Sequence, residues 1–138
     1  MTLNMMLDNA VPEAIAGALT QQHPGLFFTM VDQASVAISL TDARANIIYA
    51  NPAFCRQTGY SLAQLLNQNP RLLASSQTPR EIYQEMWQTL LQRQPWRGQL
   101  INQRRDGGLY LVDIDITPVL HPQGELEHYL ALQRDVSV

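Results

Sequence analysis

The sequence contains no lysine and only one cysteine, and each of these absences excludes classes of protein. All nine cationic side chains are arginines, so the chain has no amine for a Schiff base and no lysine for a phosphate-binding P-loop. Cys55 has no second thiol with which to form a disulfide or a CxxC metal motif. A single free thiol suits a reducing compartment.

Long apolar runs and concentrated positive charge are also missing. No stretch approaches the roughly 18 apolar residues of a membrane helix, and the first residues lack the basic and apolar regions of a signal peptide. The net charge is −3, with no basic cluster beyond Arg104–Arg105, whereas nucleic-acid binding needs concentrated positive charge. We therefore expect a cytoplasmic protein without a transmembrane segment and without direct contact to nucleic acid.

What the sequence does contain is typical of one globular domain of 138 residues preceded by a short extension. In residues 1–23, an apolar stripe at helical spacing ends at His23 and Pro24; it consists of Val11, Ile15, Ala18 and Leu19. A single stripe on a short helix must pack on something. Two alternatives remain open: the helix caps its own domain of residues 24–138, or it forms a homodimer contact.

The first part of the domain alternates short strands and short helices. A helix around Phe28 and Val31 precedes strands at 36–40 and 47–50, which a polar turn joins into a hairpin. Pro52–Thr58 is predicted to be a helix that ends at Gly59. A capping box of Ser61 and Gln64 predicts a second short helix.

A longer helix follows, with strong signals at both ends. Thr78 is predicted as its N-cap, with Pro79 in the first helical position and Glu81 at the third. Pro95 blocks continuation, so the helix should run to about Arg93.

The last third of the chain is predicted to be a three-strand meander over Trp96–Gln103, Leu109–Val119 and Glu127–Asp135. Strands and helices segregate along the chain, which indicates an α+β fold with an antiparallel sheet whose one face the helices cover. In the middle strand, Tyr110, Val112, Ile114 and Ile116 alternate with Asp113 and Asp115, which predicts its buried face. The two aspartates are expected at the surface or in an interface, and no catalytic or metal site is expected.

Asn102 is the strongest candidate for a binding residue. It shares a strand face with Gly98 and Leu100, so its amide should point into an apolar interior. A buried amide needs partners for both its donors and its acceptor. A ligand with carbonyl and N–H groups could supply them, and so could neighbouring backbone groups.

Together these motifs resemble the PAS family of sensory domains. The front half matches at Thr41–Asp42, Ile47–Phe54 and Thr58–Tyr60, and the back half at Trp96–Gly98, Arg105–Gly107 and Gln133–Ser137. More closely, the chain resembles the flavin-binding PAS domains of NifL-type nitrogen-fixation regulators, at Thr78–Arg80, Trp87, Pro95–Trp96 and Asn102.

The resemblance implies a five-stranded PAS sheet, bound FAD, a homodimer, and redox or oxygen sensing that controls a NifA-like activator. It implies no enzymatic activity, and it implies flavin contacts at Ser39, Asn69, Trp87, Asn102 and Gln133. From the residues alone, Ser39 could equally be an ordinary strand hydroxyl, Trp87 a core residue and Gln133 a surface residue. A PAS domain without cofactor, acting only in dimerisation, is the alternative function.

The same region resembles the LOV photoreceptor branch of the PAS family. Asn69–Leu73 stands where LOV domains carry Asn-Cys-Arg-Phe-Leu, and Pro70 replaces the cysteine that forms their light-driven adduct. Pro70 carries no nucleophile, so this photochemistry is not expected. Gln133 matches the LOV glutamine that contacts the flavin. Flavin N5 accepts a hydrogen bond when oxidised and donates one when reduced, so we expect the Gln133 amide to rotate when the flavin is reduced.

Overall fold

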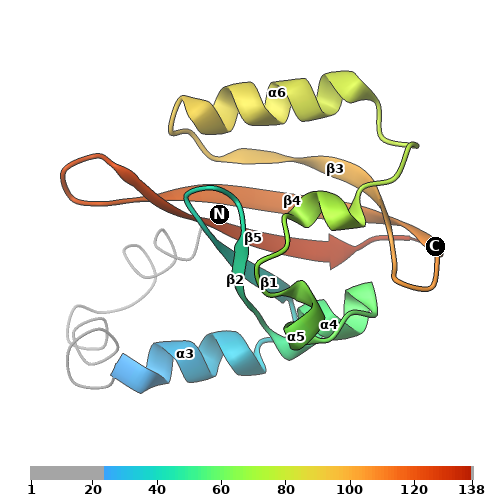
Figure 1. The fold of residues 1–138 in the computed structure, drawn as a ribbon, viewed down its shortest axis with the longest axis horizontal. Coiled ribbons are helices and arrows are strands. Elements are labelled where there is room, and N and C mark those ends of the chain that lie inside the picture. The colour runs from blue at the N-terminus through green and yellow to red at the C-terminus, as the bar shows by residue number, and fades with distance from the viewer. Residues whose placement is uncertain (1–23, 138) are drawn as a thin grey trace.

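The computed structural model describes residues 24–137, which form one antiparallel sheet with helices against it (Figure 1). The predicted helix in residues 1–23 lies outside the described residues. The elements in chain order are α3 (Pro24–Gln33), β1 (Ala37–Asp42), β2 (Ile47–Ala50), α4 (Pro52–Thr58), α5 (Leu62–Leu65), the 3-10 helix η2 (Pro70–Leu73), α6 (Arg80–Leu91), β3 (Trp96–Gln103), β4 (Leu109–Leu120) and β5 (Leu126–Asp135).

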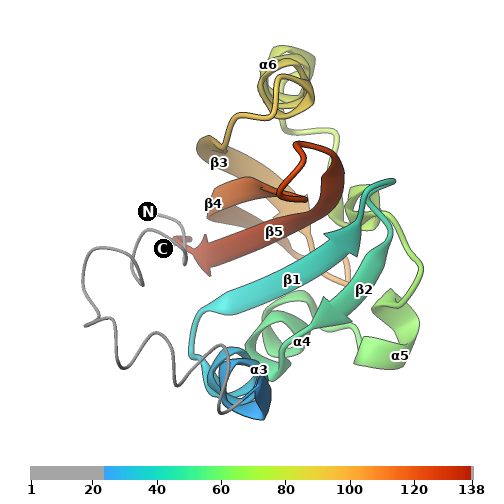
Figure 2. The same cartoon turned by 90° about the vertical axis from the view of Figure 1, so that its left-hand side faces the viewer.

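The strand order β2-β1-β5-β4-β3 joins the hairpin at the front of the chain to the meander at its end. Strands β1 and β5 pair antiparallel in the middle of the sheet, with Ala37 opposite Gln133 and Ser39 opposite Ala131. Figure 2 shows this pairing, with α6 beside β3 and the short helices α4 and α5 beside β1 and β2. The predicted α+β fold with a five-stranded antiparallel sheet is confirmed.

Asn51 ties the front half together from a fully buried position. Its side-chain oxygen caps α4 by accepting from the Phe54 amide at 3.0 Å, and it also accepts from the Ile38 amide at 2.9 Å. Its amide nitrogen donates to the carbonyl oxygens of Val31 and Val36, both at 2.9 Å. One side chain therefore joins α3, β1 and α4 and satisfies the hydrogen-bonding capacity that burial would otherwise penalise.

The predicted N-cap of α6 is wrong. Pro79 occupies the cap position and makes no side-chain capping bond. The hydroxyl of Thr78 is used elsewhere: it accepts from the Ile101 amide at 2.8 Å and donates to the Ile101 carbonyl at 3.1 Å. The helix also ends at Leu91 rather than near Arg93, because Arg93 adopts a positive φ of 64° that no α-helix continues.

Strand β3 begins with a close approach between Trp96 and Gly98. A Cβ atom added at Gly98 would lie 2.4 Å from the indole ring of Trp96, so only glycine leaves room for that ring. The ring is buried under α6, and its N–H lies 3.4 Å from a carboxylate oxygen of Glu85. This packing holds α6 against β3.

The core consists of two hydrophobic clusters rather than one. One cluster lies between α6 and the meander and includes Met86, Leu90 and Leu100. The other lies between the β1–β2 hairpin and the short helices and includes Phe54 and Leu73. Domains of this size usually bury one contiguous core, so the gap between the clusters needs an explanation.

Candidate functional site

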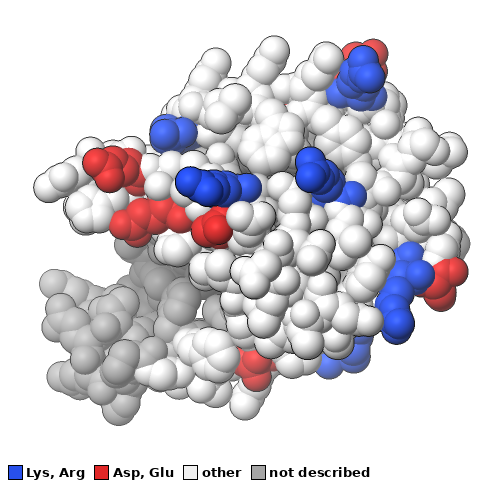
Figure 3. Space-filling view, in the orientation of Figure 1, with Lys and Arg blue, Asp and Glu red and all other residues white. Residues whose placement is uncertain are grey.

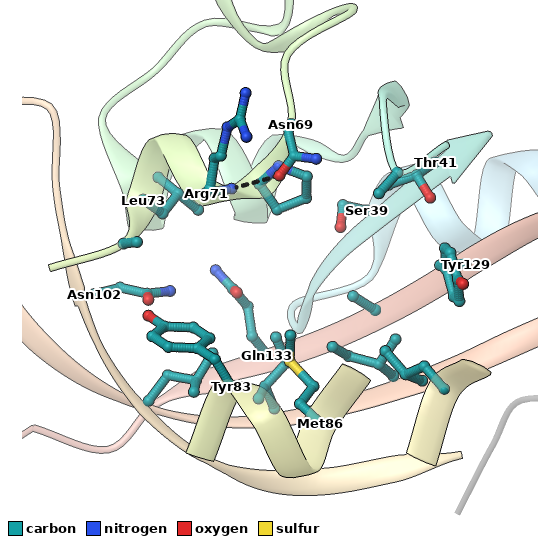
Figure 4. Close-up of a pocket in the computed structure, with 18 of the residues that line it drawn as sticks. Ser39, Thr41, Asn69, Arg71, Leu73, Tyr83, Met86, Asn102, Tyr129 and Gln133 are labelled. Carbon is teal, nitrogen blue, oxygen red and sulfur yellow. Dashed lines mark hydrogen bonds between the residues drawn. The ribbon is translucent and has the colours of Figure 1, made fainter. Parts of the chain in front are cut away.

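A cavity occupies this gap, and residues from both clusters line it, including Phe54, Leu73, Met86, Leu90 and Leu100. Its free space of about 130 Å³ greatly exceeds the roughly 10–15 Å³ that a single water molecule requires. The walls are mainly apolar, and polar side chains enter from several elements (Figure 4). Concave, apolar sites with a few convergent polar groups are typical of small-molecule binding.

All five side chains singled out in the sequence line this one cavity: Ser39, Asn69, Trp87, Asn102 and Gln133. They come from β1, the start of η2, α6, β3 and β5, and they are separated by up to nearly a hundred residues in sequence. The structure thus brings the whole predicted set together around one space.

Asn102 points inward, as the alternation in β3 predicts, and is only 5% exposed. Its strand neighbour across the ladder is Tyr110 of β4. Burial raises the pKa of the Tyr110 phenol, and the nearby amides of Asn102 and Gln133 oppose that shift. These amides do not reach hydrogen-bonding geometry, so the Tyr110 hydroxyl has no partner among the described residues.

Both faces of β5 are apolar, so the sequence could not show which face carries Gln133. The structure shows it. Gln133 is 2% exposed and lies on the inward face with Tyr129 and Ala131. Its side-chain nitrogen donates to the side-chain oxygen of Gln57 in α4 at 2.7 Å. The interpretation of Gln133 as a surface residue is wrong.

Asn69 presents mainly its donor end to the cavity. Its side-chain oxygen accepts from the Arg71 amide at 2.9 Å and caps η2, which leaves the amide N–H groups for other partners. Ser39 is buried on β1 and lines the cavity. Thr41, two residues further along the same face, donates to the carbonyl of Asp42.

Helix α6 supplies an aromatic wall. Trp87 is 37% exposed, so it is not a core residue; its ring packs edge-on against Tyr129 with ring centres 5.8 Å apart. One turn earlier, Tyr83 also lines the cavity, and its buried hydroxyl has no partner among the described residues. Leaving such a hydroxyl unpaired costs about 1–3 kcal/mol.

Four lining or supporting residues did not stand out in the sequence: Thr41, Gln57, Arg71 and Tyr83. Tyr83 had a usable signal, because it precedes Met86 and Trp87 by three and four positions and therefore shares their helix face. Arg71 follows the cap residue Asn69 and lines the cavity from an exposed position. No pattern in the sequence could have indicated Gln57, since its role depends on a hydrogen bond with the distant Gln133.

These residues fit a flat, polar-edged heterocycle such as a flavin. The apolar walls suit the faces of such a ring, and the amides of Asn102, Gln133 and Asn69 suit its carbonyl and N–H groups. The unpaired hydroxyl of Tyr83 is consistent with a missing polar partner at this site.

Other kinds of site find little support in residues 24–137. No three His, Cys, Asp or Glu side chains gather there as a metal ion would need. Asp115 pairs with Arg97 at 2.9 Å, and Asp113 accepts from Gln99 at 2.8 Å, so cross-strand contacts account for both aspartates. Figure 3 shows charges of both signs scattered over one face of the molecule. No helix in the described range is long and apolar enough to cross a membrane.

The sheet order, the helices on its inner face and the cavity between them define the PAS class of domain. The chain belongs to the PAS family, since the family model described as "PAS fold" matches residues 25–136.

Among curated proteins, the chain is 97% identical over 138 residues to a nitrogen fixation regulatory protein of Klebsiella oxytoca. It is 96% identical over 138 residues to the protein of the same name from Klebsiella pneumoniae. Both matches cover 100% of this chain, which spans 28% of the length of each relative. The solved structure of an RNA-binding Light-Oxygen-Voltage receptor is similar, with a TM-score of 0.79 and 29% identity over 94% of this chain and 35% of that one.

Proposed function

We propose that this chain is the FAD-binding sensory domain of a nitrogen-fixation regulator and that it responds to oxygen through the redox state of the flavin. The observation that carries the proposal is the convergence of Asn102, Gln133, Asn69, Ser39 and Trp87 on one apolar-walled cavity. The near-identity to nitrogen fixation regulatory proteins of Klebsiella supports the biological setting.

In this proposal the side chains divide into binding and reporting groups. The cofactor supplies the redox chemistry, because the flavin N5 position accepts a hydrogen bond when oxidised and donates one when reduced. Asn102 and Asn69 hold polar edges of the ring that keep their character in both states, and Trp87 and Tyr83 cover a face. Gln133 is the reporting group, because a carboxamide can offer either N–H or C=O to the same neighbour.

The signal from this domain acts on other protein chains. We propose that the N-terminal extension takes part in a homodimer and that the full-length regulator restrains a NifA-like transcriptional activator. No catalytic step is assigned to this domain. A cofactor-free PAS domain that acts only in dimerisation is the alternative. Such a domain would lack the visible absorption of a bound flavin.

The test is the visible absorption spectrum of the purified 138-residue chain. A flavin-type spectrum that dithionite bleaches and air restores supports the proposal. A folded, colourless chain that takes up no added FAD contradicts it and favours the dimerisation module. The matched control is the same chain with Asn102→Ala and Gln133→Leu combined, which removes two of the proposed contacts.

A further inference from the structure

Gln133 and Gln57 form a pair of carboxamides that face each other at the edge of the cavity. The side-chain nitrogen of Gln133 lies 2.7 Å from the side-chain oxygen of Gln57. Gln133 is buried on β5 and Gln57 is half-buried in the last turn of α4, so water competes weakly for this bond. Gln133 points into the cavity in Figure 4.

Such a pair has two self-consistent arrangements. The oxygen and nitrogen of a carboxamide have nearly the same shape, so either amide can reverse within the same space. If only Gln133 reversed, its oxygen would face the oxygen of Gln57, and both acceptors would lose their donor. If Gln57 reverses as well, the pair regains one N–H···O=C bond in the opposite sense. The two amides are therefore coupled.

From Gln57 a continuous set of contacts leads to the end of the sheet. The backbone oxygen of Gln57 accepts from one guanidinium nitrogen of Arg104, in the β3–β4 turn. The other donates to the carboxylate of Asp135 at 2.5 Å, and the guanidinium lies 4.0 Å from the centre of the Tyr110 ring. The Asp135 carboxylate also accepts from the Ser137 amide at 3.0 Å.

A backbone bond runs parallel to this side-chain route. The Arg105 amide donates to the carbonyl of Thr58, the residue after Gln57, at 2.9 Å. The last turn of α4 is thus attached to the β3–β4 turn by Arg104 and by Arg105. The side chain of Gln57 extends from the same turn of α4 whose backbone oxygens accept these two bonds.

We propose that Gln57 is a positioning residue for Gln133, and that the two amides reverse together and pass the state of the cavity to the Arg104–Asp135 contact at the end of β5. This inference rests on the proposed function, because reduction of the bound flavin is what reverses Gln133. The two-state element is the amide pair, and its remote readout is the contact between α4, the β3–β4 turn and the last residues of β5.

Two substitutions of Gln57 separate positioning from packing. Gln57→Glu offers only acceptor oxygens when ionised, so it holds Gln133 in its present donating orientation. Gln57→Met keeps the length of the side chain and removes both hydrogen-bonding ends. The matched control is Gln103→Met, which removes a glutamine bond of 3.2 Å to Gly107 within the same hairpin and leaves the Gln133 partner intact.

The measurement is hydrogen exchange of the Arg105 and Ser137 amides in the FAD-loaded chain, oxidised and then reduced by dithionite. We expect exchange at these two positions to differ about tenfold between the two states in the unsubstituted chain and in Gln103→Met, which corresponds to about 1.4 kcal/mol. Both Gln57 variants should retain FAD and lose the difference. The readout is a difference between two states of one variant, so a uniform loss of stability does not imitate it.

The outcomes distinguish the two proposals. If the unsubstituted chain holds reducible FAD but shows no difference at Arg105 and Ser137, the amide pair transmits nothing and this inference is wrong, while the proposed function stands. If Gln57→Met keeps the full difference, the inference is also wrong, whether or not Gln57→Glu folds. If the unsubstituted chain binds no FAD at all, the proposed function fails, and the inference fails with it.

Discussion

The hydroxyl of Thr78 forms two hydrogen bonds with the backbone of Ile101, accepting from its amide at 2.8 Å and donating to its carbonyl at 3.1 Å. Strand β3 lies at the edge of the sheet, and at this point a side chain takes the place of a neighbouring strand. A backbone bridge between Ala74 and Asn102 adjoins it. The segment before α6 therefore holds the part of β3 that carries Asn102.

Thr78→Val should lower the free energy of unfolding by about 1–3 kcal/mol, because valine fills the same space and leaves the Ile101 amide without its partner. The Ile101 carbonyl keeps its bond from the Ser75 hydroxyl. Urea unfolding measures the change. Thr89→Val is the matched control, since its hydroxyl makes only one bond, to the Glu85 carbonyl within α6. Equal losses in the two variants would contradict the special role of Thr78.

Asn102→Ala should weaken FAD retention about 5- to 150-fold, equivalent to about 1–3 kcal/mol for one or two lost buried hydrogen bonds. Titration of the FAD-depleted chain with FAD, followed by fluorescence, gives the dissociation constants. Gln99→Ala is the control, because Gln99 lies on the opposite face of β3 and bonds Asp113 there. Unchanged affinity in Asn102→Ala would remove Asn102 from the proposed site.

Blue light should produce no thiol adduct in the FAD-loaded chain. Pro70 lines the cavity where the LOV photoreceptors carry their reactive cysteine, and proline has no nucleophile. The only thiol belongs to Cys55 in α4, which does not line the cavity and whose pKa is raised by burial. Absorption spectra before and after illumination test this, with Pro70→Cys as the variant that adds a thiol to the wall. A light-induced, dark-reverting loss of absorbance in the unsubstituted chain would show the argument to be wrong.

Deletion of residues 1–23 should convert a dimer into a monomer that still binds FAD. The reason is the apolar stripe of Val11, Ile15, Ala18 and Leu19, which needs a partner surface. Sedimentation equilibrium gives the oligomeric state, and the absorption spectrum reports the cofactor. Val11→Ser with Ile15→Ser is a milder variant that keeps the chain length. An unchanged dimer in both would move the interface to the described domain.

The contact between Arg104 and Asp135 should contribute stability at neutral pH and lose it in acid. Burial acts to raise the pKa of Asp135, but the Arg104 guanidinium and the Ser137 amide outweigh it and hold the pKa below its ordinary value of 3.8. A carboxyl whose pKa is lowered by folding stabilises the fold above the pKa of the unfolded chain, and this stabilisation disappears as the pH falls through the lower, folded value.

The difference in unfolding free energy between the unsubstituted chain and Asp135→Asn should therefore be largest above about pH 5 and shrink toward about pH 2. Urea unfolding across this range measures it. The comparison isolates Asp135 from Asp42, whose pKa is also lowered, mainly by the Asn46 amide. A difference that is constant with pH would contradict the assignment.

Local signals in the sequence predicted much of the fold. The bounds of β2, α4 and β3 agree with the structure at both ends. Proline and glycine account for this at α4, where Pro52 opens the helix and Gly59 closes it with a φ of 81°. The capping box of Ser61 and Gln64 forms as predicted. Each of these depends on residues within a few positions of one another.

The errors and omissions concern groups with a choice of partner. The hydroxyl of Thr78 is suited to cap α6, but it accepts a hydrogen bond from the amide of Ile101, which is distant in sequence. The apolar helix face around Trp87 allowed either a core position or a ligand contact, and only the structure shows that Trp87 is 37% exposed and lines the cavity. Gln133 lies on a strand with two apolar faces, so alternation could not assign its direction.

The sequence by itself determined the element types, the antiparallel meander and the inward direction of Asn102, because hydrophobic periodicity and backbone stereochemistry act over short distances. Only the tertiary structure decided that β1 pairs with β5, which sets Ser39 and Gln133 on one wall of the cavity. It alone decided that Gln133 meets Gln57. A polar side chain forms its hydrogen bond with whichever group the packed fold brings within about 3 Å, and no local pattern encodes that neighbour.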